Sequence, residues 1–157
     1  MTTNYTANDL EELDPIHRIL VLRDMASGIW QSDDIRAALA VGQAILESGI
    51  LREHISGLAK FNNLFGIKGH GTDGTTAMNT REVMEGKSIM IKAGFACNKN
   101  LHESFQQHYN LLHIPRYQRV LEAKTIEKAT TSLVLCGYAT DPLYASKLMS
   151  IISKRVL

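Results

Sequence analysis

Helical periodicity is the clearest pattern at the start of the chain. Apolar residues recur every three or four positions from Asp14 to Trp30, which predicts an amphipathic helix over residues 14–30. Pro15 suits the first helical position, and Asp14 suits the cap before it. The polar stretch 1–13 lacks such a repeat, and we expect it to be mobile.

A second helix is predicted by a run of small and apolar residues. We expect it to begin at Ser32, which can cap the first turn, where the two carboxylates that follow favour the positive end of the helix dipole. The run continues to Glu47, and Gly49 offers a C-terminal stop because glycine accepts the left-handed backbone. A short third helix is expected over residues 51–60.

The pattern then changes to one that is typical of turns and strands. Turn-forming residues dominate residues 61–75, and no helical repeat survives there. Short runs with β-branched residues predict strands over residues 75–95, and the Glu-Gly-Lys sequence at 85–87 is the expected hairpin turn. We therefore predict a small β region in the middle of the chain.

The last third of the chain returns to helical periodicity. Four helices are predicted, with their caps and stops at Leu101–His113 after Asn100, at Pro115–Ala123, at Thr125–Cys136 before Gly137, and from Asp141-Pro142 onward. Helices, a small β insert and more helices together predict an α+β fold that is mainly α.

Length and composition indicate one folded domain over residues 1–157, with 45% hydrophobic residues. The formal net charge of +1 is unevenly distributed: residues 1–34 hold two basic and seven acidic residues, whereas residues 35–157 hold 15 basic and nine acidic ones. The basic excess suits an anionic polymer such as the bacterial cell wall, and it is also ordinary for a soluble protein.

Neither the cysteines nor the histidines indicate a metal or cofactor site. Cys97 and Cys136 are too few for a disulfide framework, and no Cys-x-x-Cys or His-Glu-x-x-His motif occurs. The spacing of His102, His108 and His113 suits surface or packing roles. We therefore expect no cofactor and no metal.

No secretory leader or membrane span is evident. The first basic residue is Arg18, and the apolar run from Ile19 to Leu22 is too short for a signal peptide. No stretch is long enough to cross a membrane. If the substrate lies outside the membrane, another component must carry the chain there, or a leader has been removed.

Glu47 is the candidate general acid, because the helix that carries it is otherwise mainly apolar or small. A carboxyl on such a surface is partly desolvated, which favours its protonated form. A carboxyl that is protonated near neutral pH can protonate a glycosidic oxygen. The alternative interpretation is a solvent-facing glutamate at a helix end.

Three blocks of sequence resemble those of glycoside hydrolase family 73, the glucosaminidases of bacterial autolysins, phage lysins and flagellar rod-assembly proteins. They are residues 43–49 (QAILESG), 62–69 (NNLFGIKG) and 137–145 (GYATDPLYA). Any one block is weak evidence, whereas three in order with matching intervals are specific. The resemblance covers residues 35–155.

The resemblance implies a lysozyme-like fold, in which a helical lobe and a small β-hairpin lobe flank a substrate cleft. It implies an endo-β-N-acetylglucosaminidase that cleaves the β-1,4 bond after N-acetylglucosamine in peptidoglycan. We expect glycan strands as the partner, no nucleic acid, no membrane insertion and a monomer. Such a chain fits a phage lysin released from the host cytoplasm, a virion-associated lysin or a trimmed secreted autolysin.

The resemblance also implies roles for individual residues. Glu47 is the general acid, and Glu82 is the second carboxylate on a β-hairpin, with Glu85 as its rival because hairpin alignments slip easily. Tyr138 matches a tyrosine that lines the reaction site. The residues that shape the sugar groove are Asn63, Phe65 and Gly66. Outside these roles, we expect Tyr144 to be a packing residue.

The chain departs from the family pattern at positions that concern substrate contacts. Ile50 and Leu51 follow the first block where an aromatic residue is frequent, and Val83 stands where a tyrosine is common. The segment 96–98 replaces an arginine and a tyrosine. These departures leave Glu47 untouched.

Alternatives remain open for both the reaction and the class of protein. The route can be inverting, retaining or assisted by the substrate N-acetyl group. The same fold also serves muramidases and lytic transglycosylases, which break the alternate bond. A non-catalytic wall-binding or phage-structural module is the alternative from a different class.

Overall fold

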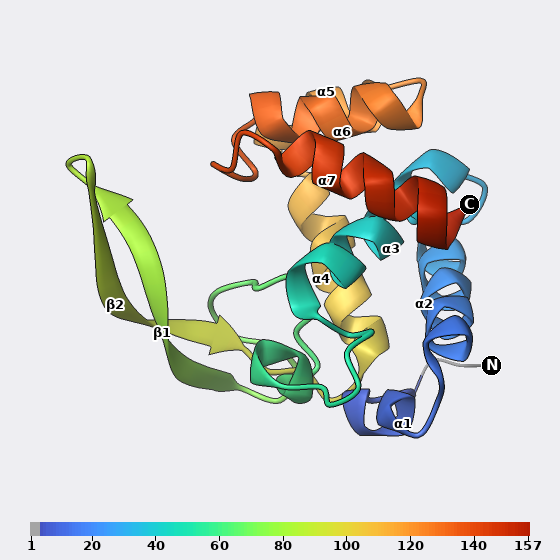
Figure 1. Ribbon diagram of the computed structural model, residues 1–157, viewed down its shortest axis with the longest axis horizontal. Coiled ribbons are helices and arrows are strands. Elements are labelled where there is room, and N and C mark those ends of the chain that lie inside the picture. Colours follow the sequence, from blue (N-terminus) through green and yellow to red (C-terminus); the bar gives the residue numbers. More distant parts are fainter. Residues whose placement is uncertain (1–3) are drawn as a thin grey trace.

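The computed structural model describes residues 4–157. The segments with helical periodicity and those with strand periodicity form two distinct parts of the molecule (Figure 1). Helices from both ends of the chain form one lobe, which we call the helical lobe, and a single β-hairpin projects from its side. The predicted α+β class, which is mainly helical, is confirmed. Residues 1–3, the first part of the stretch expected to be mobile, lie outside the described residues.

The chain forms a helix earlier than its sequence suggested. Helix α1 (Ala7–Glu11) begins at a reciprocal cap, in which Thr6 and Asp9 exchange hydrogen bonds between side chain and backbone. Leu10 is fully buried, and this tertiary contact compensates for the polar composition of the segment. Residues 7–11 thus form a capped helix within the stretch that was expected to be mobile.

Helix α2 (Pro15–Trp30) has the predicted bounds and cap. The Asp14 side chain accepts a hydrogen bond from the His17 amide at 2.9 Å, and proline occupies the first helical position. Buried residues on one side of α2 face the rest of the lobe, while residues such as Ile16 remain exposed. The amphipathic pattern thus located the helix, although Ile16 and Leu20 are exposed and Arg18 is buried.

Helix α3 (Asp34–Ser48) forms the centre of the helical lobe. Its residues from Arg36 to Ala44 are all buried, because alanines and Gly42 allow α2, α6 and α7 to pack closely around it. Gly49 ends the helix with φ 66°, as predicted. Asp33 caps the helix instead of Ser32, since its side chain accepts a bond from the Arg36 amide.

The predicted third helix over residues 51–60 is replaced by a later 3-10 helix, η1 (Gly57–Phe61). The Ile55 side chain is buried, and its amide donates to the Glu11 carboxylate at 2.8 Å. Gly57 then takes a left-handed backbone conformation with φ 62°. The burial of Ile55 and its hydrogen bond to Glu11 therefore keep residues 51–56 from forming a helix.

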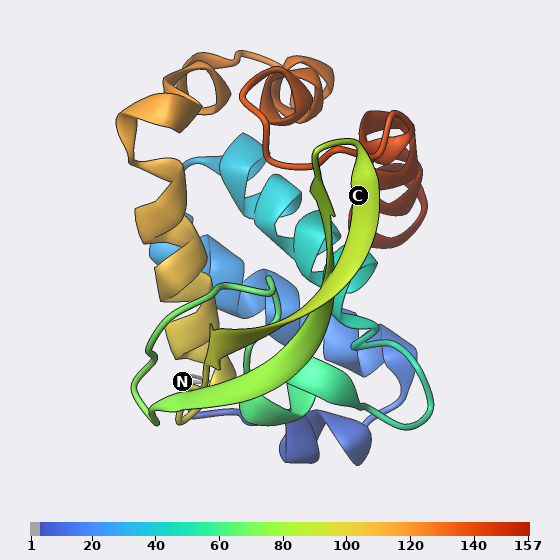
Figure 2. The ribbon, with the colours of Figure 1, turned by 90° about the vertical axis from the view of Figure 1, so that its left-hand side faces the viewer.

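Strands β1 (Thr75–Met84) and β2 (Lys87–Ala96) form the projecting hairpin, as predicted. The turn at Glu85 and Gly86 has positive φ at both residues (52° and 76°), which matches the twist of a tight hairpin. Figure 2, viewed from the hairpin side, shows the strands in front of the helical lobe, and Figure 1 shows their tip standing apart from it. Only the base, at Phe95 and Ala96, is buried.

The C-terminal helices complete the lobe beside α3 (Figure 1). They are α4 (Leu101–Leu112), the 3-10 helix η2 (Pro115–Tyr117), α5 (Gln118–Glu122), α6 (Ile126–Leu135), α7 (Tyr144–Ile151) and the π-helical segment η3 (Ile152–Val156). The single helix predicted over 115–123 is therefore split in two. The last helix begins at Tyr144 and not at Pro142, because the Asp141 carboxylate accepts the Leu143 amide in a preceding turn.

Among the described residues, no helix combines the length and apolar character that a membrane crossing requires.

Two glycines in helix interiors should respond in opposite ways to alanine. A Cβ atom on Gly42 would lie 2.5 Å from Ile152 Cγ1 and 3.0 Å from Leu148 Cδ1, whereas one on Gly28 would meet nothing within 4 Å. We expect Gly42→Ala to lower the free energy of unfolding by about 1–3 kcal/mol through overpacking. Gly28→Ala should raise it by about 0.5–1 kcal/mol through helix propensity. Urea denaturation measures both, and equal changes would contradict the packing described for α3.

Candidate active site

Glu47 lies in the last turn of α3, where the buried helix reaches the surface. Its side chain is exposed to solvent, although protein atoms surround it closely enough that desolvation dominates its ionisation. Burial raises the pKa of the Glu47 carboxyl from its ordinary value of 4.5 to about 8, while hydrogen bonds from Tyr144 and Tyr138 act in the opposite direction. The carboxyl is therefore protonated at neutral pH and still open to an approaching ligand.

Tyr138 is held beside Glu47 by the turn that ends α6. Gly137 has φ 83°, and the Tyr138 amide donates to the Leu133 carbonyl at 2.9 Å. Arg116 donates to the carbonyls of Cys136 (2.8 Å) and Gly137 (2.9 Å), so a cation stabilises the negative end of the helix. The Tyr138 hydroxyl consequently lies 3.5 Å from Glu47 Oε2.

Tyr144 contacts the same carboxyl oxygen, which the sequence analysis missed by treating this residue as packing. Its hydroxyl donates to Glu47 Oε2 at 3.3 Å and accepts from the Gln43 amide nitrogen at 2.9 Å. Burial raises the pKa values of the Tyr138 and Tyr144 hydroxyls, so both stay neutral and able to donate. Gln43 lies four residues before Glu47 on the same helix face, but no local pattern pairs it with Tyr144, which is 101 residues away.

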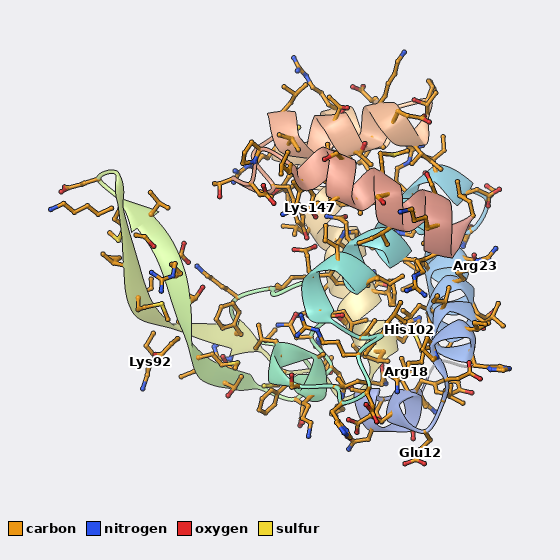
Figure 3. The ribbon with its side chains drawn as sticks, viewed as in Figure 1. Glu12, Arg18, Arg23, Lys92, His102 and Lys147 are labelled. Atoms are coloured by element: carbon orange, nitrogen blue, oxygen red, sulfur yellow. The ribbon has the colours of Figure 1, made fainter. Side chains whose placement is uncertain are left out.

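Glu82 and Glu85 occupy different environments on the hairpin. Glu82 is half-buried, and its carboxylate pairs with Lys68 Nζ at 2.9 Å. Glu85 lies in the exposed turn at the tip. Figure 3 shows Lys92 pointing away from the helical lobe, and strand alternation places Glu82 on the opposite face, turned toward that lobe.

No hydrogen bond or ion pair among residues 4–157 joins Glu82 to Glu47. Glu47 lies on α3 of the helical lobe, whereas Glu82 lies on β1 of the hairpin. Of the two hairpin glutamates, Glu82 lies within strand β1 and Glu85 lies in the turn between the strands.

The residues expected to shape a sugar groove divide into a buried pair and an exposed glycine. Asn63 is 1% exposed, and its side chain bonds to the backbone of Ile67 and Ala96. Phe65 is also buried and stacks on His108 with ring centroids 4.1 Å apart. These contacts favour a supporting role for Asn63 and Phe65 over direct sugar contact, whereas Gly66 is exposed with open space beside it.

The described part of the chain offers no grouping of three His, Cys, Asp or Glu side chains that could hold a metal ion. Cys97 and Cys136 are both free thiols.

A helical lobe, a projecting hairpin and a protonated carboxyl between tyrosines define a lysozyme-like protein of the α+β class. The chain belongs to the glucosaminidase family of glycoside hydrolases: the family's sequence profile, described as mannosyl-glycoprotein endo-beta-N-acetylglucosaminidase, matches residues 23–156. The resemblance carried by the three sequence blocks is thereby confirmed.

Individual relatives agree with this assignment. The exo-glucosaminidase LytG of Bacillus subtilis is 34% identical over 92% of this chain, and the peptidoglycan hydrolase FlgJ of Salmonella typhimurium is 37% identical over 74% of it. The chain spans 54% and 38% of the lengths of these two proteins. The catalytic domain of the autolysin Auto from Listeria monocytogenes has a TM-score of 0.75 at 32% identity, with 87% of this chain and 81% of that domain covered.

The raised pKa of Glu47 should make this residue costly for stability at neutral pH. Between pH 4.5 and about 8 the folded protein keeps a proton that the unfolded chain releases, so stability falls as pH rises through this window. Glu47→Gln removes the titration, and we expect its melting temperature to exceed that of the parent by a margin that grows from pH 4.5 to pH 8. Calorimetry at several pH values measures this margin, with Glu85→Gln as the control for loss of one acidic side chain. A constant margin would contradict the desolvated position of Glu47.

Proposed function

We propose that this chain is an endo-β-N-acetylglucosaminidase that cleaves the β-1,4 bond after N-acetylglucosamine in the glycan strands of peptidoglycan. The observation that carries the proposal is Glu47, a carboxyl that is protonated at neutral pH, open to solvent and located in the first block of the family pattern. Residues 1–157 act as one catalytic domain, as a monomer, on the bacterial cell wall.

In the proposed mechanism, Glu47 donates its proton to the departing glycosidic oxygen. The bond between this oxygen and the anomeric carbon then breaks, and positive charge develops on the sugar. Glu47 becomes a carboxylate as its proton leaves, and the hydroxyls of Tyr138 and Tyr144 are placed to donate to it. Such donors have their greatest effect on the charged form, since hydrogen bonds to ionised groups are the stronger ones.

Glu82 is the proposed second carboxylate, and its half-buried face and pairing with Lys68 support this choice over Glu85. It would activate water, form a covalent bond to the sugar, or stabilise the charge while the substrate N-acetyl group attacks. The first two routes need the Glu82 carboxylate directly, whereas the third needs it less. The Glu82→Gln variant therefore separates the routes in part.

Loss of the acid should abolish turnover while loss of the turn glutamate should not. We expect Glu47→Gln to slow the clearing of purified peptidoglycan by about 10²–10⁴-fold, because it removes general acid catalysis. Glu85→Gln should stay within about twofold of the parent, as expected for an exposed residue in the hairpin turn. Mass spectrometry of parent digests should show N-acetylglucosamine at the new reducing ends.

Other outcomes of this experiment point to specific alternatives. N-acetylmuramic acid at the new reducing ends would show that the enzyme cleaves the alternate β-1,4 bond, as a muramidase does. Release of single sugars from chain ends would indicate an exo-acting enzyme, the activity named for the Bacillus relative. Failure of the parent on several wall types, together with retained binding to the same walls, would favour the binding module.

A further inference from the structure

A line of buried polar side chains leads from α4 to the carboxyl of Glu47. His108 Nε2 lies 2.7 Å from Gln43 Oε1, and the Gln43 amide nitrogen donates to Tyr144, which in turn contacts Glu47 Oε2. Gln43 and His108 are fully buried, and Tyr144 is 6% exposed. Three elements, α3, α4 and α7, therefore contribute to the environment of one oxygen atom.

The chemistry of the groups fixes the direction of each bond. An amide oxygen can only accept, so His108 donates through Nε2, and the opposite nitrogen, Nδ1, carries a lone pair. The Gln43 amide nitrogen can only donate, so the single hydrogen of the Tyr144 hydroxyl is left for Glu47.

The opposite orientation of the Gln43 amide is less favourable. It would make His108 accept at Nε2 and carry its hydrogen on Nδ1, which is buried without a partner in the described structure. An unpaired buried N–H is rarer and costlier than an unpaired lone pair. In that orientation Tyr144 would also donate to Gln43 and leave Glu47 without this hydrogen bond. His108 thus selects the arrangement in which Tyr144 faces the acid as a donor.

Because two tyrosine hydroxyls donate to Oε2 of Glu47, this oxygen accepts hydrogen bonds and does not carry the carboxyl proton. Tyr138 and Tyr144 both direct their hydroxyls at Oε2 of Glu47, at 3.5 and 3.3 Å. We propose that His108 and Gln43 are positioning residues, which fix the Tyr144 hydroxyl toward Oε2 and so leave Oε1 to carry the proton that is donated. The inference rests on the proposed role of Glu47 as the general acid.

The groups that face Glu47 from neighbouring elements are Tyr117 of η2, Tyr138 after α6 and Tyr144 of α7. No lysine, arginine or histidine within residues 4–157 forms an ion pair with Glu47. Burial raises the pKa of Glu47, and the hydrogen bonds from the tyrosine hydroxyls lower it. Removing one of these donors should therefore raise the pKa further. Burial also lowers the pKa of His108 to about 3, so it stays a neutral donor across the working range.

The test compares variants that break the line of bonds at different points. Tyr144→Phe removes one oxygen atom, His108→Leu removes the donor to Gln43, and His108→Gln restores an N–H donor at a similar position. Tyr109→Phe is the matched control, because it removes a tyrosine hydroxyl on α4 away from Glu47. The readouts are kcat and KM on soluble glycan fragments across pH, and the ¹³C NMR titration of the Glu47 side-chain carboxyl.

We expect Tyr144→Phe to shift the alkaline limb of the pH profile and the NMR titration upward by about half a pH unit or more. Its kcat should fall about tenfold with KM within about twofold, the effect of one lost donor to a charged group. His108→Leu should shift both in the same direction, while His108→Gln and Tyr109→Phe should match the parent.

An unchanged NMR titration in His108→Leu would overturn the inference, even if Tyr144→Phe shifts it, Glu47→Gln is inactive and the proposed function stands. Conversely, a Glu47→Gln variant that keeps full activity would overturn the proposed function. The NMR titration would then still report on the positioning of the carboxyl, because it needs no turnover.

Discussion

The structure depends on one constraint: the Glu47 carboxyl is placed at the end of α3, a helix whose residues 36–44 are buried in the core. The small residues of α3 allow α2, α6 and α7 to pack against it, and the same close packing desolvates Glu47. A carboxyl in this position retains its proton at the pH where a free glutamate is charged. The contacts that stabilise the helical lobe therefore also create its candidate acid, at a cost in stability confined to one residue.

The two sides of the site are supported in different ways. Around Glu47, hydroxyls arrive from segments that follow it by about ninety residues or more, and each is fixed by a helix end or a buried bond. Glu82, the proposed second carboxylate, is carried by a hairpin that is buried only at its base, where β2 meets the loop held by Asn63. The surroundings of Glu47 are thus the more tightly packed of the two, and Glu82 stands on the more exposed element.

Local signals in the sequence were sufficient for most elements but not for the interactions between them. The helix from Pro15, the stop at Gly49 and the hairpin turn followed from capping and turn preferences that act within a few residues. The cap at Asp33 in place of Ser32 shows the usual uncertainty of helix ends, since neighbouring residues offer equivalent oxygens.

The bond between Gln43 and Tyr144 joins residues 101 positions apart, and periodicity carries no information about such a pairing. The family pattern pointed to Glu47 and Tyr138, yet it could not show that the Asn63 side chain is occupied by hydrogen bonds to the backbone.

The exposure of the hairpin has a consequence for how members of the family can differ. Val83, where the family pattern favours tyrosine, is 69% exposed and near the tip. A change of side chain at this position therefore alters the surface of the hairpin and leaves the buried residues around Glu47 untouched.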